Sequence, residues 1–282
     1  MPLKLMYITN NPDVAVIAQK YGVDRIWVDL EYKGKEERQR GMDTVKNHHT
    51  IKDVQKMRPF INKSELLVRV NPWNDESINE INAVIESGAD IVMLPMWKSV
   101  SEVKEFIHII NGRVKNILLL ETKEAETCLE DVLKLPGIDE IYIGLNDLSL
   151  SYHLSFMFEL LSNGTVERLM RKIKEAGIPC GFGGIAKIGY GDVPAEMIIL
   201  EHYRLGSTRA ILSRTFCNST SVCDIDKIDQ IFKENIKKFY DFEHYAEHVS
   251  SDIFKENQEK LKSIISTVAT KIKSHSENKI IN

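Results

Sequence analysis

Two segments decide the fold prediction: ILLLET at residues 117–122 and IYIGLND at residues 141–147. Each is an apolar run typical of a strand buried on both faces, and each ends in a carboxylate, Glu121 or Asp147. The two carboxylates are 26 residues apart, about the length of one strand–helix repeat in a parallel α/β protein. Because neighbouring parallel strands end at the same edge of a sheet, we expect both carboxylates at one edge.

Two carboxylates at one edge predict a metal site. Their hard oxygen ligands suit a divalent cation such as Mg²⁺ or Mn²⁺, and a pair of protein ligands leaves coordination positions for water and substrate. The alternative is that the two acids cap helices or form unrelated salt bridges. That alternative explains either acid alone better than it explains the pair.

Short β-rich segments recur along the whole chain. The predicted strands cover residues 3–9, 25–30, 66–70, 91–95, 116–121, 140–145, 179–184 and 209–213. The segments between them carry apolar residues at helical spacing, as at Val103, Phe106, Ile107 and Ile110. Eight strands with crossover helices predict an α/β fold of the closed (β/α)8 TIM-barrel type; an open doubly wound sheet is the alternative.

The barrel prediction uses only part of the chain. We assign residues 1–220 to a (β/α)8 catalytic domain and residues 221–282 to a C-terminal helical extension. One extension helix can serve as the eighth barrel helix, and a later one carries an apolar stripe. The stripe consists of Leu261, Ile264, Ile265, Val268 and Ile272. It requires a covering surface, either on the barrel or on another subunit.

Charge, hydrophobicity and cysteine content limit the partners and the cellular compartment that we expect for this protein. The formal net charge of −4 and the lack of a basic stripe give no reason to expect nucleic acid or an anionic membrane as partner. No stretch approaches the length of a spanning apolar helix, and the first residues lack a signal-peptide layout. The four cysteines form no zinc-type spacing, so we expect free thiols in a cytoplasmic protein.

Polar residues gather where the predicted strands end. Asp29 and Glu31 follow the second strand, Arg69 ends the third, and Arg214 follows the last. In a TIM barrel these ends and the loops after them form the active face. The set combines acids for a metal with arginines for an anionic substrate.

The order of motifs resembles the metal-dependent HpcH/HpaI hydroxy-keto-acid aldolases, within the citrate lyase β-subunit superfamily. The matching pieces are VDLE at 28–31, VR at 68–69 with WND at 73–75, LPM at 94–96, ETKEA at 121–125 and IGLNDLS at 143–149. They occur in consistent order over roughly residues 3–215. Each piece is weak alone, and the set is specific.

The resemblance implies roles for individual residues. Glu121 and Asp147 would hold the divalent metal, and Arg69 would lie against the carbonyl oxygen of a pyruvate-like substrate and stabilise its enolate. The backbone at Asn146 and Asp147 would receive the substrate carboxylate, and we place Gly144 and Arg214 with these substrate-binding residues. Electrostatic stabilisation of the developing oxyanion is consistent with this arrangement.

These roles imply a class II, metal-dependent carbon–carbon lyase acting on 2-oxo acid and aldehyde substrates. The resemblance also implies a homo-oligomer. One alternative is a citrate-lyase-like enzyme that cleaves a β-hydroxyacyl-CoA thioester. Another is a catalytically altered barrel that serves as a metabolite-binding or scaffold subunit.

Tyr32 departs from the pattern of the aldolases, which usually have a histidine at this position as the base. A tyrosine with a pKa near 10 is a poor general base at neutral pH. The candidates for catalytic roles are therefore Arg69, Glu31, Tyr32 and His48, the last as part of the His48–His49 pair. A metal-bound water is a further alternative.

Two other signals have ordinary explanations. HYAEH at 244–248 places two imidazoles one helical turn apart, but a zinc site needs a third ligand, and a solvated helix face is the favoured interpretation. The glycine-rich stretch at 181–191 is typical of a tight turn, with a phosphate-binding loop as the alternative.

Overall fold

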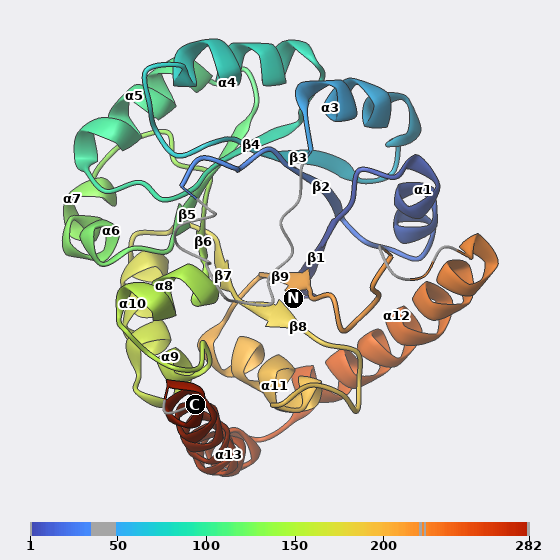
Figure 1. The fold of residues 1–282 in the computed structure, drawn as a ribbon, viewed down its shortest axis with the longest axis vertical. Coiled ribbons are helices and arrows are strands. Elements are labelled where there is room, and N and C mark those ends of the chain that lie inside the picture. Colours follow the sequence, from blue (N-terminus) through green and yellow to red (C-terminus); the bar gives the residue numbers. More distant parts are fainter. Residues whose placement is uncertain (1, 35–48, 220–221, 223, 281–282) are drawn as a thin grey trace.

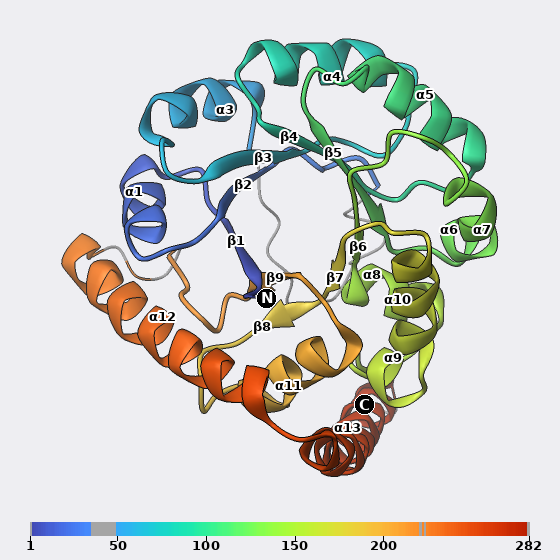
Figure 2. The same cartoon turned by 180° about the vertical axis from the view of Figure 1, so that it is seen from behind.

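The structure is a computed structural model that describes residues 2–34, 49–219, 222 and 224–280, with side chains up to residue 274. Its centre is a barrel of parallel strands surrounded by helices (Figures 1 and 2). The strands are β1 Lys4–Ile8, β2 Arg25–Asp29, β3 Glu65–Arg69, β4 Ile91–Leu94, β5 Lys115–Leu120, β6 Glu140–Ile143, β7 Cys180–Phe182, β8 Gly184–Ile185 and β9 Arg209–Leu212. They pair in the order β7-β6-β5-β4-β3-β2-β1-β9-β8.

The segment predicted as one strand at residues 179–184 is two strands. β7 pairs with β6, whereas β8 pairs with β9, so the barrel is completed through the bend between them. Gly183 lies at the bend with φ +45°, in the left-handed region that favours glycine. The other seven strands lie within two residues of their predicted ends, and the TIM-barrel prediction is confirmed.

Helices follow the strands and cover the outside of the barrel (Figure 1). They are α1 Pro12–Lys20, α3 Ile51–Met57, α4 Ser77–Glu86, α5 Val100–Ile110, α6 Lys123–Thr127, α7 Leu129–Val132, α8 Leu145–Ser151, α9 Glu159–Ser162, α10 Thr165–Glu175, α11 Ala195–Leu205, α12 Ile225–His248 and α13 Ser251–Ile280, with a 3-10 turn at Arg58–Phe60. Side-chain caps start several of them: Asn11 accepts from the Asp13 amide at α1, and Ser99 accepts from the Glu102 amide at α5.

Side chains inside the barrel form layers, because alternate strand residues point inward. The register between β2 and β3 shows all three layers: Arg25 is opposite Glu65, Trp27 opposite Leu67 and Asp29 opposite Arg69. The first pair is ionic and lies at the amino ends of the strands. The second is apolar, and the third brings charges to the carboxyl ends.

The ionic layer closes the amino-terminal end of the barrel. Both Arg25 and Arg209 make paired hydrogen bonds to Glu140, at 2.6–2.8 Å, and Arg25 also bonds Glu65. Burial raises the pKa of Glu140, but the two guanidinium groups outweigh this and lower it to about 2. The charges are therefore held as a compensated network below the apolar layer.

Tyr142 in the apolar layer ties the bent strand to its neighbours. Its hydroxyl lies 2.9 Å from the backbone oxygen of Phe182 and also contacts that of Gly183, and it accepts a 3.0 Å hydrogen bond from the Ile211 amide. Burial raises the pKa of this hydroxyl, so it stays protonated. One side chain of β6 thus joins β7 and β9 across the bend.

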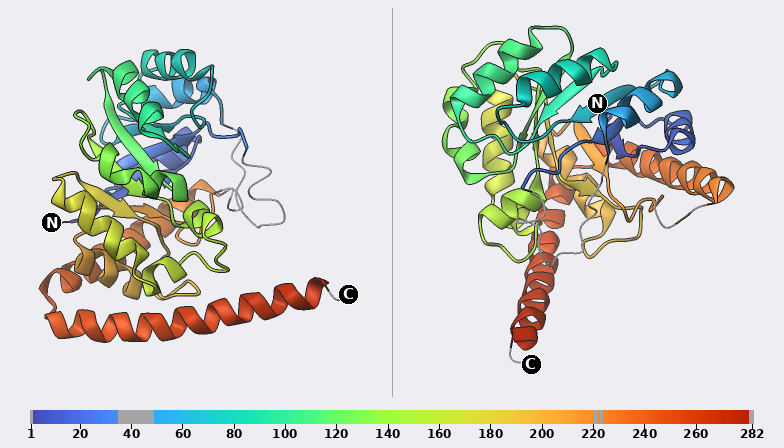
Figure 3. Two further views of the ribbon diagram at one scale, coloured as in Figure 1. Left: turned by 90° about the vertical axis from the view of Figure 1, so that its left-hand side faces the viewer. Right: turned by 45° about the horizontal axis from the view of Figure 1, so that its top comes forward.

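The two C-terminal helices have different positions. α12 contacts α1 and α11, which is the place of the eighth barrel helix (Figure 1). α13 packs on α9 and α11, and its far end runs past the barrel (Figure 3). Leu261 and Ile265 of the predicted stripe are buried there, whereas Ile264, Val268 and Ile272 are half-buried. The barrel therefore covers the side of α13 that carries Leu261 and Ile265, and the other stripe residues only in part.

Within the described part of the chain, no helix combines the length and apolar character needed to cross a bilayer.

Candidate active site

A cavity of about 330 Å³ opens at the carboxyl ends of the barrel strands. It is in the size range of small-molecule sites. It is lined by Tyr7, Ile8, Trp27, Asp29, Arg69, Leu119, Glu121, Tyr142, Gly144, Leu145, Asn146, Asp147, Met157, Gly183, Gly184, Ile211, Leu212, Ser213, Arg214, Cys217, Asn218 and Ser219. Charged residues from β2, β3 and the segments after β5 and β6 share this space with apolar and aromatic side chains.

Arg69 is held by two buried carboxylates. Its Nε and Nη2 each donate a 2.8 Å hydrogen bond to Asp29, and its Nη1 lies 3.2 Å from Oε2 of Glu31. The guanidinium carbon also lies 5.2 Å from the centre of the Trp27 ring, within cation–π range. The planar group is therefore fixed in one orientation at the cavity wall.

The neighbouring carboxylates keep the Arg69 guanidinium positively charged. Burial alone lowers the pKa of the guanidinium, but the negative charges of Asp29, Glu31 and Glu121 raise it well above its usual value. Arg69 and Glu121 line the same cavity, so a permanent positive charge shares this space with the Glu121 carboxylate.

Glu121 is placed by its backbone neighbours. It follows β5, is buried, and its Oε1 accepts a 3.1 Å hydrogen bond from the amide of Met96. Gly144 leaves room for the same carboxylate, because a Cβ at this position would lie 2.6 Å from Oε2 of Glu121. Glycine at residue 144 is therefore a steric requirement of the Glu121 position.

Asp147 comes from the first turn of α8, the short helix that starts directly after β6 and Gly144. Like Glu121, it is buried and lines the cavity. The turn is stabilised locally, since Ser149 Oγ donates a 2.7 Å hydrogen bond to the backbone oxygen of Asn146. The two carboxylates expected at one sheet edge thus reach one cavity.

For the metal site that the sequence predicts at Glu121 and Asp147, we expect Gly144→Ala to weaken binding of Mn²⁺ by about tenfold while the barrel stays folded, since the new methyl displaces the Glu121 carboxylate. Calorimetric titration with Mn²⁺ measures the effect. Gly184→Ala is the matched control, because Gly184 lines the same cavity and its Cβ would make only an ordinary 3.4 Å contact with Ser213. Equal affinities in the two variants would contradict the steric role of Gly144.

Part of the cavity wall was missed at the sequence level. Tyr7 from β1 and Trp27 from β2 line it, and the Tyr7 hydroxyl lies 2.9 Å from the backbone oxygen of Cys217 and 3.0 Å from Oγ of Ser219. Burial raises the pKa of Tyr7, so its hydroxyl stays protonated. Alternation along β2 is the signal that could have identified Trp27, which is two residues before Asp29.

The cavity contains most of the predicted site residues. Arg69, Glu121, Gly144, Asn146, Asp147 and Arg214 all line it, with Arg214 exposed at its rim. Glu31 is buried behind Arg69. His48 lies outside the described residues.

Tyr32 lies elsewhere. Its side chain is 59% exposed and lines a second cavity, of about 390 Å³, together with His49. Asn71 Oδ1 accepts hydrogen bonds from the amides of Tyr32 and Lys33, which fixes the chain in this direction. His49 contacts the end of β2 directly, since its Nδ1 accepts a 3.1 Å hydrogen bond from the Asp29 amide.

Comparison with protein families gives one match. A family model described as HpcH/HpaI aldolase/citrate lyase matches residues 4–165, more than half of the chain. A search of curated proteins gave no match.

Solved structures share the fold. An HpcH/HpaI aldolase/citrate lyase family protein from Burkholderia cenocepacia J2315 is similar with a TM-score of 0.61 and 15% identity, over 80% of this chain and 94% of that one. An HpcH/HpaI aldolase from Desulfitobacterium hafniense DCB-2 has a TM-score of 0.59 and 14% identity, over 81% and 93%. RipC from Yersinia pestis has a TM-score of 0.53 and 16% identity, over 82% and 94%.

Proposed function

This chain belongs to the HpcH/HpaI aldolase/citrate lyase family, and from that premise we propose that it is a divalent-metal-dependent carbon–carbon lyase. Its substrate would be a hydroxylated 2-oxo acid that is cleaved to an aldehyde and the enolate of pyruvate or a related 2-oxo acid. One observation carries the proposal: two buried carboxylates, Glu121 and Asp147, and the fixed guanidinium of Arg69 line the same cavity.

The residues present fit a divalent cation. Glu121 and Asp147 supply hard oxygen donors, and Gly144 keeps the Glu121 carboxylate unobstructed. Four carboxylates, counting Asp29 and Glu31, share this region with the buried guanidinium of Arg69, so bound positive charge would be favourable. When bound, Mg²⁺ or Mn²⁺ would act as a Lewis acid toward the substrate's carbonyl oxygen.

Arg69 would stabilise the charge that develops in the reaction. Cleavage next to a carbonyl places negative charge on the carbonyl oxygen as the enolate forms, and a preorganised cation lowers this barrier without reorienting at that moment. Asp29 and Glu31 act through Arg69: they hold its plane and keep it charged. We therefore class both acids as positioning residues.

Substrate orientation would use the two sides of the cavity. The backbone at Asn146 and Asp147 would receive the carboxylate of the 2-oxo acid, in keeping with the family resemblance. The aldehyde half would then extend toward the wall formed by Tyr7, Ile211 and Leu212, with Arg214 at the rim. An acceptor aldehyde with an apolar body suits that wall.

As the carbon–carbon bond breaks, the proton of the substrate's hydroxyl group has to pass to a base, and under this proposal that base is not Tyr32. We expect Tyr32→Phe to retain most of the lyase activity, because the hydroxyl belongs to a side chain that is 59% exposed and lines the second cavity. Steady-state kinetics of the variant measure the effect. Loss of nearly all kcat with an unchanged fold would make the Tyr32 hydroxyl catalytic.

The experiment that tests the proposed function is a retro-aldol assay. A set of 4-hydroxy-2-oxo acids is incubated with the metal-loaded protein, and released pyruvate is followed by coupled reduction to lactate. We expect release with Mg²⁺ or Mn²⁺ and none after chelation with EDTA. Release that is unaffected by chelation would overturn the metal dependence, and acyl-CoA cleavage without pyruvate release would favour the thioester alternative.

We also propose a homo-oligomer whose smallest unit is a dimer. The support is the part of the α13 stripe that the barrel does not fully cover: Ile264, Val268 and Ile272 are only half-buried, and the helix continues past the barrel (Figure 3). Light scattering at micromolar concentration is expected to give a mass above that of the single chain. Truncation after Ser250 should shift it to the monomer, and a monomeric mass for the intact chain would contradict the proposal.

A further inference from the structure

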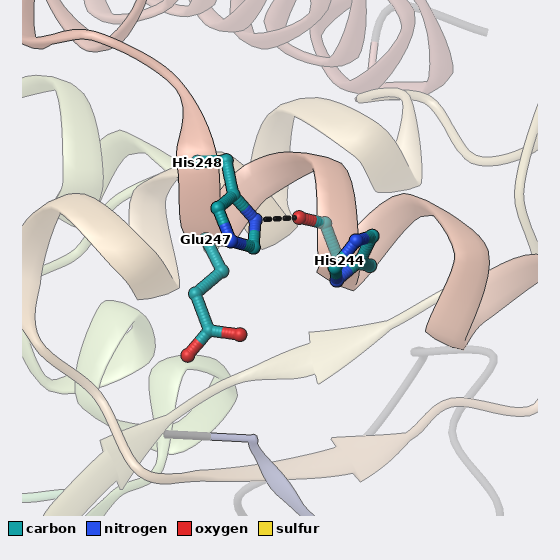
Figure 4. Close-up of side chains that lie close together, drawn as sticks. All are labelled: His244, Glu247 and His248. Carbon is teal, nitrogen blue, oxygen red and sulfur yellow. Dashed lines mark hydrogen bonds between the residues drawn. The ribbon is translucent and has the colours of Figure 1, made fainter.

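Three potential metal ligands lie together on the last turn of α12. None of them is among the residues that line the barrel cavity. Figure 4 shows His244, Glu247 and His248 on one side of the helix, as expected for spacings of three and four residues. One ligand atom from each residue lies within 4.8 Å of the other two. The zinc interpretation of this segment required a third ligand, and Glu247 occupies that place.

His248 is already oriented for such a role. Its Nδ1 lies 2.7 Å from the backbone oxygen of His244 (dashed in Figure 4). A carbonyl oxygen only accepts, so Nδ1 carries the proton and Nε2 presents its lone pair. Metal-binding histidines typically use this arrangement, in which the second ring nitrogen donates to a backbone carbonyl or a carboxylate.

The surroundings also favour a cation. His248 is the last residue of α12, and the carboxyl end of a helix carries partial negative charge. All three side chains are exposed. Tetrahedral zinc with bonds of about 2.0–2.1 Å needs ligand atoms roughly 3.4 Å apart, so binding would draw together ligand atoms that now lie within 4.8 Å of one another. The Glu247 carboxylate already interacts with another group, and the ion would replace that partner.

We propose that His244, Glu247 and His248 form a binding site for one zinc-class divalent ion, distinct from the barrel cavity. Two imidazole nitrogens and one carboxylate oxygen are a ligand set that Zn²⁺ uses, with a fourth position left for water. The oxygen donors of Glu121 and Asp147 suit Mg²⁺ or Mn²⁺ instead, so the two sites differ in metal preference. The ion would brace the end of α12 immediately before α13 begins at Ser251.

Zinc titration in excess Mg²⁺ tests the proposal, because Mg²⁺ competes at oxygen sites and poorly at imidazole sites. Calorimetry on the intact chain is expected to show one equivalent of Zn²⁺ bound. His244→Ala and His248→Ala should each weaken that binding by at least about tenfold, and Glu247→Gln should weaken it as well. The control is His108→Ala, since His108 is an exposed histidine on α5.

A spectroscopic measurement identifies the ligands directly. With Cu²⁺ as the probe, electron paramagnetic resonance should show nitrogen couplings from two imidazoles in the intact chain and from one in His248→Ala. Wild-type zinc affinity in both histidine variants, or no zinc binding by the intact chain, would overturn the site. Lyase activity with Mg²⁺ should be the same in His248→Ala and wild type, so the outcome is independent of the proposed function.

Discussion

Glu121→Gln and Asp147→Asn are each expected to weaken binding of Mn²⁺ or Mg²⁺ by at least about a hundredfold, more than is typical for loss of a residue that only supports a ligand. Each change removes one anionic oxygen ligand and preserves the size of the side chain. The carboxylates end or follow strands of a packed barrel, so the fold should survive the substitution. Calorimetric titration measures the affinity, and circular dichroism checks the fold.

Glu124→Gln is the matched control for these variants. Glu124 is exposed on α6, three residues after Glu121, and does not line the cavity described above. The control therefore changes the same net charge near the same strand end without touching the site. Wild-type Mn²⁺ affinity in both ligand variants would show that the metal assignment is wrong.

Arg69→Lys is expected to slow enolisation of pyruvate at least about tenfold, because lysine keeps the charge but loses the planar fork that bonds Asp29 at two points. A lysine ammonium would not reproduce both bonds to Asp29 and the contact with Glu31. The rate is followed as exchange of deuterium into the methyl group of pyruvate. A fall in kcat with little change in KM would indicate an interaction made in the transition state.

Two comparisons separate chemistry from stability at Arg69. Arg171→Lys, at an exposed pair on α10, should leave exchange unchanged. Arg69→Ala should also unfold more easily, since removing one partner of a buried ion pair costs about 3–5 kcal/mol and here leaves Asp29 and Glu31 uncompensated. An undiminished exchange rate in Arg69→Lys would remove Arg69 from the mechanism.

The sequence predicted the barrel well because its strands are buried on both faces. The apolar runs Ile117–Leu120 and Ile141–Ile143 have no charged residue, Glu121 directly follows the first, and Asp147 lies in the first helical turn after the second. The same feature explains why the cluster of Arg69, Glu121 and Asp147 could be predicted: parallel strands deliver their ends to one face.

The bend at Gly183 was harder to predict. A single strand and two strands joined by a glycine share the same local pattern, and the difference depends on which neighbours each half pairs with. Leu145, from another part of the chain, also occupies the space that a Cβ at residue 183 would need. Such long-range contacts are not visible in local periodicity.

The direction taken by the segment after β2, which carries Tyr32, was also not predictable from the sequence. Because Tyr32 directly follows the Asp29–Glu31 motif, it was expected in the catalytic cavity. Instead, hydrogen bonds from the backbone amides of Tyr32 and Lys33 to Asn71 direct this segment to the second cavity. The role of Asp29 as the main partner of Arg69 follows from the β2–β3 register. Register depends on strand pairing, which a single sequence does not reveal.

The most direct test of the central claim is deuterium exchange into the methyl group of pyruvate, catalysed by the intact chain and followed by proton NMR. The account predicts exchange with Mn²⁺ or Mg²⁺ present, none after EDTA, and recovery when metal is added back. This requires the metal site, Arg69 and a group that accepts the methyl proton, but not the unidentified aldehyde. No exchange by the folded, metal-loaded chain would contradict the claim that the cavity forms an enolate.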